Sequence, residues 1–481
     1  MLLICCTSLL IVGMDATIMN VALPSLQRDL GASVSGLQWT IDAYTLVVAS
    51  LLMLAGSTAD RVGRRRTFQV GLAVFTSASL LCSLAPSLGW LIGFRALQGV
   101  GASMLNPVAM SIITNTFTDP KERARAIGVW GGVVGISIAA GPILGGVLVT
   151  TVGWPAIFLI NVPVGIAALV LTALFVPESK APRARRIDPV GQLLVFLTLA
   201  AMIYAIIEAP RLGWGSGLII GLLAGSAVSA AALVGWELHR IEPLLDVRFF
   251  RSATFSGATL IAVCGFAGFA GFLFVNTLYL QNDRGLSPLE AGLYLLPMAA
   301  MTAICAPISG RLVGSRGTRP SLLVAGVAMT AGTLLLTRVS LDSGRWLLFS
   351  AYLLFGVGFG TVNAPITNTA VSGMPLAQAG VAAAVASTSR QVGTALGVAV
   401  VGTAYTSHLA DGPLPAAHLG WWIVAGCTLV VLLIGLLTSG RWAMASAART
   451  ADRLAGTEPL AGTGGAGGGP MAPRVALKTE R

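Results

Sequence analysis

Residues 56–66 read Gly-Ser-Thr-Ala-Asp-Arg-Val-Gly-Arg-Arg-Arg and join two apolar segments at 38–56 and 68–86. Each segment has about 20 residues, which is the length that an α-helix needs to cross the hydrocarbon core of a bilayer. Short basic loops between such segments are typical of membrane proteins. The stretch therefore predicts two membrane-spanning helices joined on one side of the membrane.

The same loop pattern recurs at residues 310–320, which read Gly-Arg-Leu-Val-Gly-Ser-Arg-Gly-Thr-Arg-Pro. Both loops have Gly at their first and eighth positions and Arg at the tenth, but the second copy has no acid equivalent to Asp60. Corresponding short loops in two halves of a chain are typical of a transporter built by internal duplication.

Apolar segments recur along the whole chain, and we predict fourteen spans. They are expected at 2–24, 38–56, 68–86, 90–112, 126–148, 157–176, 190–209, 217–236, 254–281, 289–309, 321–338, 346–368, 380–404 and 419–439. The expected fold is an all-α polytopic membrane protein with two six-helix halves and two inserted helices. The predicted division is 1–176 for the N-terminal half, 177–251 for the inserted helices with their loops, 252–440 for the C-terminal half, and 441–481 for a disordered tail.

The composition supports the membrane interpretation. Hydrophobic residues make up 55% of the 481 residues and charged residues only 10%, whereas soluble domains carry about 25% charged residues. This excludes a soluble enzyme, a secreted disulfide scaffold and a disordered chain, and the long apolar blocks argue against a porin-type barrel. The six cysteines lie in apolar segments without metal-ligand spacing, and no phosphate-binding loop is present, so we expect no metal, cofactor or ATP-driven step.

The distribution of charge predicts the orientation in the membrane. The formal net charge is +11, which in a soluble protein would suggest a nucleic-acid partner. Here most basic residues lie in alternate loops between the apolar segments and after residue 440, so we expect a lipid bilayer and no nucleic acid. The positive-inside rule then places both termini in the cytoplasm of a cell-membrane protein.

Three further motifs accompany the loop at 56–66: residues 14–24 (MDATIMNVALP), residues 91–103 (LIGFRALQGVGAS) and residues 141–146 (GPILGG). Together the four segments resemble motifs of the major facilitator superfamily, and residues 14–24 resemble a signature of its fourteen-helix drug:proton antiporters. The resemblance covers about residues 1–440. It implies a monomeric secondary transporter, not an enzyme, that uses the proton gradient to export small lipophilic or cationic drugs by alternating access.

Two alternatives remain open. One is a dedicated exporter of an endogenous metabolite or a self-made antibiotic. The other, from a different class, is a non-transporting membrane scaffold or an embedded enzyme; the duplicated halves and the lack of a catalytic constellation argue against it.

Asp15 lies near the middle of the first span, where an ionised carboxylate costs about 2.5–3.5 kcal/mol even on insertion-based scales. It is therefore a candidate for proton coupling, and the alternative is a structural hydrogen bond between helices. Arg95 lies inside the fourth span and needs a carboxylate or several carbonyls as partners; the resemblance implies a role in proton transfer. Asp42 is the third candidate, but it lies one turn inside the end of its span, where we expect water to reach it.

The loop at 56–66 is the candidate conformational latch, with Gly56, Asp60, Arg61, Gly63, Arg64 and Arg65. Ordinary positive-inside charge accounts for the arginines but not for Asp60. A carboxylate at a helix end can hold the N-terminus of another helix, and the resemblance places the helix start near Gly380 opposite Asp60 in the outward-facing state. Asp119 and Glu122 are expected partners of Arg65.

In the fifth span, Gly141, Pro142, Gly145 and Gly146 form the motif that resembles an antiporter signature. Glycines allow close helix contact and a proline bends a helix, so both plain packing and a gating hinge stay open. The expected substrate contacts are apolar and amide side chains facing a central cavity, with Asn20, Asn276 and Asn363 as candidates. Arg390, the only charge in its span, is a further candidate for the cavity, and its expected partner is a carboxylate or a carbonyl across the cavity.

Overall fold

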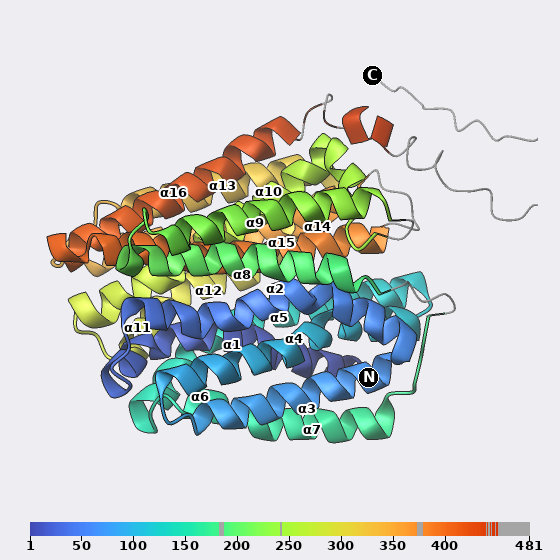
Figure 1. Cartoon of the computed structure of the whole chain (residues 1–481), viewed down its shortest axis with the longest axis horizontal. Coiled ribbons are helices and arrows are strands. Elements are labelled where there is room, and N and C mark those ends of the chain that lie inside the picture. Colours follow the sequence, from blue (N-terminus) through green and yellow to red (C-terminus); the bar gives the residue numbers. More distant parts are fainter. Residues whose placement is uncertain are drawn as a thin grey trace, which may run out of the picture.

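The computed structural model describes residues 1–181, 187–240, 243–372 and 379–438, together with 440, 443, 445–447 and 449–450. Most of the predicted tail at 441–481 therefore lies outside the described residues. All regular elements in the described part are helical, which confirms the expectation of an all-helical fold. The long helices lie side by side and run roughly along one direction (Figure 1).

The helices fall into three consecutive sets. The N-terminal set is α1 (Leu2–Asp29), α2 (Val34–Val62), α3 (Arg64–Ser83), α4 (Leu88–Thr116), α5 (Pro120–Thr151), α6 (Ala156–Leu159) and α7 (Asn161–Phe175). A hairpin follows, with α8 (Pro189–Leu212) and α9 (Gly217–Leu238). The C-terminal set is η1 (Val247–Arg251), α10 (Ala253–Leu278), η2 (Tyr279–Asp283), α11 (Pro288–Tyr294), α12 (Leu296–Arg316), α13 (Thr318–Leu336), α14 (Arg345–Val371), α15 (Ala379–Ser407), η3 (Leu409–Asp411) and α16 (Pro413–Thr438).

Several helices extend beyond the apolar segments that predicted them, because backbone hydrogen bonding continues into the polar flanks. Two predicted spans are divided instead. The segment at 157–176 is split between α6 and α7, and the segment at 289–309 is split between α11 and α12. Pro163 and Pro297 follow these breaks, and a proline cannot donate the backbone hydrogen bond that would continue the preceding helix. In the described residues, eleven helical stretches are long and apolar enough to cross a membrane.

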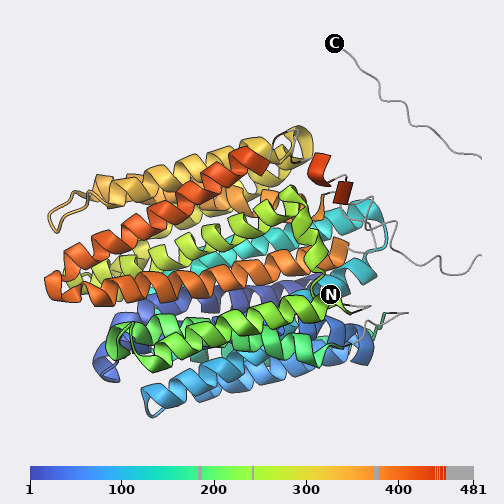
Figure 2. The same cartoon turned by 45° about the horizontal axis from the view of Figure 1, so that its top comes forward.

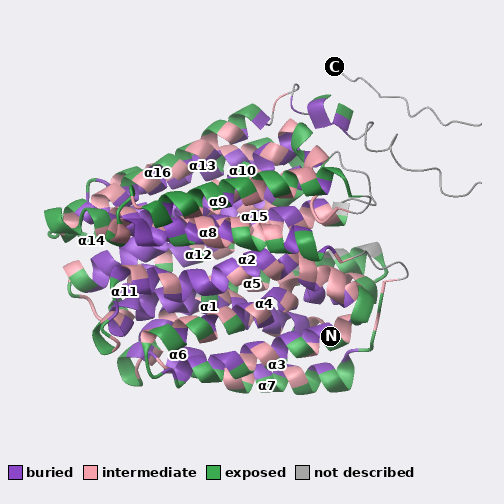
Figure 3. Cartoon of the chain, in the orientation of Figure 1, coloured by how far each residue is buried: buried purple, intermediate pink, exposed green. Residues whose placement is uncertain are grey.

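The N-terminal and C-terminal sets each pack mainly within themselves, and the α8–α9 hairpin lies against them. In Figures 1 and 2 the hairpin is green, between the blue helices and the yellow-to-red ones. The α8 helix packs on α2 and α15, where the Trp39 Nε1–H donates to Glu208 Oε1 at 3.1 Å. Figure 3 shows buried residues concentrated on α1 and α2 and exposed residues along α9.

The two ends of the bundle differ in how the sets are joined. We call the end with Met1 and the α2–α3 connection the terminal end, and the end with the α1–α2 connection the far end. At the far end, Gln281 donates to the Val21 carbonyl at 2.9 Å and Asn282 donates to Gln27 Oε1 at 3.3 Å. Slightly deeper, Gln38 Nε2 donates to the carbonyls of Val398 and Ala399.

At the terminal end, the described residues form no hydrogen bond between the N-terminal and C-terminal sets. The hydrogen bonds that the described residues form between the two sets therefore lie toward the far end, and the sets also pack directly through α2 with α15 and α5 with α12.

Candidate functional site

An ion pair is enclosed within the N-terminal set. Asp15 lies midway along α1, and Arg95 lies about two turns into α4. The Arg95 Nη1 and the Asp15 Oδ2 are 2.6 Å apart, and each side chain is only 1% exposed. A charge-assisted hydrogen bond of this length, away from water, is among the stronger polar contacts in a protein.

Two amides complete the shell around the carboxylate. Gln98 Nε2 donates to Asp15 Oδ1 at 3.0 Å and to Ser79 Oγ at 2.8 Å. Asn161 Nδ2, at the start of α7, donates to the same Asp15 oxygen at 3.3 Å. The Gln98 Oε1 in turn accepts from Arg95 Nη1 at 2.6 Å. Because the partners of Asp15 come from other helices, the network connects α1, α3, α4 and α7.

Arg95 has further partners that do not depend on Asp15. Its Nε donates to the Thr40 carbonyl of α2 at 2.9 Å. Its guanidinium carbon lies 4.3 Å from the centre of the Tyr44 ring and 5.8 Å from that of Phe158, distances at which a cation interacts favourably with an aromatic face. The guanidinium would therefore remain held on one side if the carboxylate lost its charge.

The structure brings Asp15 and Arg95 together, and it adds two residues that sequence reasoning missed. Gln98 follows Arg95 by three positions, a spacing that places both on one helix face. Asn161 is the one amide in the apolar run from 156 to 175. Both signals were present in the sequence, but neither indicated which carboxylate these amides would contact.

Asp42 does not lie where we expected it. The side chain is fully buried, so the prediction that water reaches it is wrong for this conformation. Its Oδ1 accepts from Thr45 Oγ1 at 3.3 Å, while its Oδ2 has no partner among the described residues. Position along a span predicts depth, but neighbouring helices decide exposure, and α2 is covered by α4, α8 and α15.

The loop at 56–66 is organised by a residue that the sequence analysis did not single out. Glu178 accepts from the backbone N–H groups of Arg65 and Arg66 at 3.1 and 3.2 Å, and so caps the N-terminus of α3. Gly63 has φ +132°, and a Cβ there would lie 2.6 Å from the Glu178 carboxylate. The positive φ therefore favours glycine at this position, and a side chain there would also displace the Glu178 carboxylate from its place at the start of α3.

The expected partners of the loop arginines need correction. Asp60 Oδ1 forms an ion pair with Arg64 at 3.0 Å, one helical turn away. Arg65 Nη2 donates to the Ala173 carbonyl at 2.8 Å and does not pair with Asp119 or Glu122. The reason is local: Asp119 is the N-cap of α5 and accepts from the N–H groups of Lys121 and Glu122.

The remaining latch residues show little contact in this conformation. Arg61 is exposed, and nothing lies within 4 Å of a Cβ added to Gly56. The predicted contact of Asp60 with the helix start near Gly380 concerns the outward-facing state and stays a prediction. In this conformation α15 begins at Ala379, and residues 373–378 before it lie outside the described residues.

The glycine motif of α5 lies at two helix contacts. A Cβ added to Gly141 would meet Thr17 and come within 3.1 Å of the Ile18 backbone nitrogen, and one added to Gly145 would lie 2.7 Å from Ile18 Cγ1. On another face, a Cβ at Gly146 would lie 2.7 Å from Leu289 Cα of α11. Beside it, the Pro142 carbonyl approaches Gly292 of α11 too closely for a Cβ there. The motif therefore permits α5 to contact both sets of helices.

The amide residues proposed for the cavity lie in different environments. Asn276 is fully buried, and its Oδ1 accepts from the Tyr352 hydroxyl at 2.5 Å, so it joins α10 to α14. Asn20 is also buried and donates to the Ala16 carbonyl of its own helix. Asn363 is partly exposed and accepts from Arg390 Nη1 at 3.2 Å.

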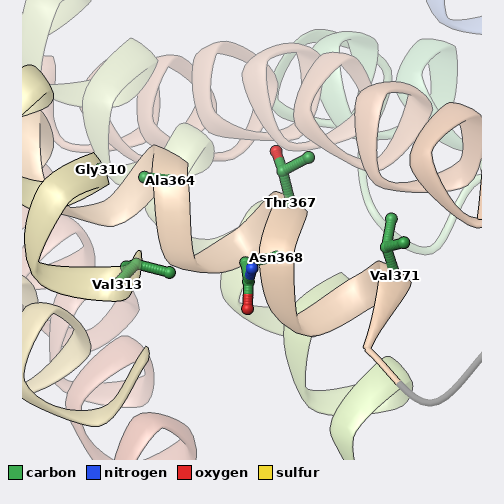
Figure 4. Close-up of a pocket in the computed structure, with 6 residues that line it drawn as sticks. All are labelled: Gly310, Val313, Ala364, Thr367, Asn368 and Val371. Atoms are coloured by element: carbon green, nitrogen blue, oxygen red, sulfur yellow. The ribbon is translucent and has the colours of Figure 1, made fainter. Parts of the chain in front are cut away.

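One cavity in the described structure has a volume of about 390 Å³ and lies between α12 and α14, near the terminal end. It is lined by Gly310, Val313, Ala364, Thr367, Asn368 and Val371 (Figure 4). No group of three or more His, Cys, Asp or Glu side chains suited to a metal ion occurs in the described part of the chain.

Comparisons with a family model and with individual proteins both show relatives of this chain. The family model of the Major Facilitator Superfamily matches residues 5–398. The chain is 38% identical over 401 residues to the multidrug resistance protein Stp of Mycobacterium tuberculosis (strain CDC 1551 / Oshkosh), covering 83% of this chain and 74% of that protein. It is 39% identical over 412 residues to the tetracenomycin C resistance and export protein of Streptomyces glaucescens, covering 85% and 76%.

Among solved structures, the crystal structure of a D-xylose-proton symporter matches with a TM-score of 0.66, covering 90% of this chain and 96% of that chain. The sequence identity is 14%, so this likeness shows the fold alone.

Proposed function

The chain belongs to the major facilitator superfamily, and we propose that this multi-pass membrane transporter is a proton-coupled antiporter that exports small lipophilic molecules by alternating access. The single observation that carries the proposal is the enclosed pair of Asp15 and Arg95, with both side chains 1% exposed. Its relatives are drug-resistance and export proteins by name, which supports efflux as the direction of transport.

The chemistry of the pair suggests how a proton acts. Breaking a buried pair by removing the charge of one partner costs about 3–5 kcal/mol. A proton on Asp15 neutralises the carboxylate and removes the attraction that holds it to Arg95. The guanidinium keeps Thr40 and Tyr44, both of α2, as partners. Protonation therefore favours separation of α1 from α2 and α4, which Arg95 still joins. Loss of the proton favours the closed network seen here.

Coupling of substrate export to proton movement needs only that the proton and the substrate compete or alternate. If the substrate binds one conformation more tightly and a proton on Asp15 stabilises the other, each ligand shifts the same equilibrium in the opposite direction. Asp42 is the second candidate for a proton, because a buried carboxylate with one unpartnered oxygen is costly in its charged form.

We propose the following topology. Two six-helix halves, 1–176 and 252–440, rock about the contacts at the far end, and residues 177–251 supply two peripheral helices. The basic connections support placing the terminal end and both termini in the cytoplasm. The far end, where the hydrogen bonds between the sets occur, then faces outward and the terminal end inward. The protein acts as a monomer.

A second candidate is a dedicated exporter of a metabolite or antibiotic made by the same cell. The relative named as a tetracenomycin C resistance and export protein favours this alternative, because its name describes one compound. A dedicated exporter would protect against one structural class, and a multidrug transporter would protect against several.

The test is a susceptibility profile of an efflux-deficient host that expresses the full chain, measured with and without a protonophore. We expect protection against at least one lipophilic antibiotic, lost when the proton gradient is collapsed. Counterflow of that antibiotic in proteoliposomes then separates transport from indirect effects. Protection and counterflow that persist unchanged without any proton exchange would contradict proton coupling.

A further inference from the structure

A second arginine within a helix span, Arg390, is partly exposed and differs from Arg95 in its partners. Arg390 lies near the middle of α15. Its Nη1 donates to Asn363 Oδ1 and to Thr367 Oγ1, each at 3.2 Å, and its Nη2 donates to Ser387 Oγ at 2.8 Å. All three acceptors are neutral, and none of the carboxylates in the described residues lies within ion-pair distance of Arg390.

The C-terminal set contains no acid at the depth of Arg390. Its described acids lie in the connections and helix ends at the far end: Asp283, Glu290, Asp342 and Asp411. The contrast with Arg95 is direct, because that guanidinium faces Asp15 at 2.6 Å. A guanidinium keeps its proton under all physiological conditions, so Arg390 contributes a positive charge that its neighbours orient but do not neutralise.

The arginine adjoins an open cavity whose lining is largely apolar. Thr367, which accepts from Arg390, also lines the cavity of about 390 Å³ between α12 and α14. Figure 4 shows Val313 and Gly310 on one helix and Ala364, Thr367, Asn368 and Val371 on the other. The lining combines aliphatic surface with a few polar groups, and it is open on one side.

Away from the ends of its helices, the N-terminal set has two described carboxylates, Asp15 and Asp42, and neither is available to a cation in this conformation. Asp15 is already neutralised by Arg95, and Asp42 is fully buried in this conformation. The unbalanced charge next to the cavity is therefore positive. Partner recognition favours complementary charge, so a lipophilic molecule with an acidic oxygen fits this interior better than a lipophilic cation.

We propose that Arg390, held by Asn363, Thr367 and Ser387, is an anion-recognition site for the exported molecule, and that the substrates are lipophilic acids such as carboxylates or acidic phenols. This inference rests on the proposed export function and narrows the class of substrate, because the sequence alone did not separate lipophilic from cationic drugs. The acidic oxygen binds the guanidinium, while the apolar body occupies the cavity between α12 and α14.

The test compares two lipophilic probes of similar size and opposite charge, 1-pyrenebutyrate and 1-pyrenebutylammonium, binding to the purified full-length protein in one detergent. We expect the anion to bind more tightly to the wild type. Arg390→Gln should weaken anion binding by at least about tenfold, the effect of losing one hydrogen bond to a charged group, and leave cation binding unchanged. Arg390→Lys should keep most of the anion preference, because it keeps the charge.

The matched control is Arg345→Gln, which removes an exposed guanidinium at the other end of α14 and should alter neither affinity. Equal binding of both probes by the wild type, or an equal loss of both in Arg390→Gln while Arg390→Lys binds normally, would overturn the inference. These outcomes do not depend on proton coupling. A protein that prefers the anion but shows no proton exchange in proteoliposomes would contradict the proposed function and leave the charge preference intact.

Discussion

At the scale of the residue, the Asp15 network is closed on every side, so its behaviour depends on charge more than on access. The carboxylate receives hydrogen bonds from Arg95, Gln98 and Asn161. Losing the charge while keeping the shape is therefore the most informative change, because it separates the proton-binding role from the role of a hydrogen-bonded tie between helices.

We predict that Asp15→Asn abolishes proton-driven accumulation while the protein still folds and inserts, because Asn accepts hydrogen bonds but cannot take up a proton. Asp15→Glu should retain part of the activity. The measurement is proton release from vesicles when a transported antibiotic is added, at matched protein abundance. Exchange at the wild-type rate in Asp15→Asn would make Asp15 a structural tie. Asp42→Asn is the comparison, and because Asp42 is buried we expect a measurable but smaller loss there.

Asp60 provides a second prediction at this scale. Its ion pair with Arg64 is partly exposed, with 34% of the Asp60 side chain accessible, and such pairs contribute about 0–1 kcal/mol. We therefore expect Asp60→Asn to leave the melting temperature nearly unchanged but to lower turnover more than substrate affinity, because a latch changes the populations of conformations. Uptake into inverted vesicles gives both quantities.

Arg64→Gln is the matched control for Asp60, since it removes the same ion pair. If the two variants lost turnover equally, the pair with Arg64 would account for the effect and no contact with the start of α15 would be needed.

At the scale of the element, α5 depends on small residues at particular positions. We predict that Gly141→Val severely impairs transport, because its side chain would overlap Thr17 and the backbone of Ile18 on α1, and overpacking of this kind costs about 1–3 kcal/mol. Gly132→Val in the same helix is the control, because nothing lies within 4 Å of a Cβ added there. Membrane abundance and uptake are measured for both, and equal behaviour of the two variants would refute close packing as the role of the motif.

At the scale of the whole molecule, the two sets of helices are hydrogen-bonded to each other only toward the far end in the described residues. We predict that a disulfide between the cysteines introduced by Gln27→Cys and Asn282→Cys, once formed and verified, blocks transport, because alternating access requires these sets to separate at that end. Reductant should restore activity.

The crosslink needs a control that leaves the two sets free to move. Ser340→Cys with Ser343→Cys places a disulfide within the C-terminal set, where the two hydroxyls are 3.2 Å apart, and should leave transport unchanged. Full activity of the oxidised Gln27→Cys, Asn282→Cys double variant, with the crosslink verified, would argue against rocking of the halves.

The sequence by itself determined the all-helical membrane fold and the family, because apolar length, basic loops and motif order are local properties that need no knowledge of packing. It also identified Asp15 and Arg95, since a charge inside an apolar segment is costly wherever its partners lie. Pro163 is a local signal for the break before Asn161. The predicted span at 157–176 nevertheless ran through that break.

Only the tertiary structure decided which groups meet. Gln98 and Asn161 share the Asp15 carboxylate because α1, α4 and α7 converge there, and Glu178 caps α3 because the chain after α7 returns to the α2–α3 connection. The burial of Asp42 and the neutral partners of Arg390 were likewise unreadable from position alone. Exposure and pairing depend on side chains that are distant in sequence, and their convergence is a property of helix packing, not of any one segment.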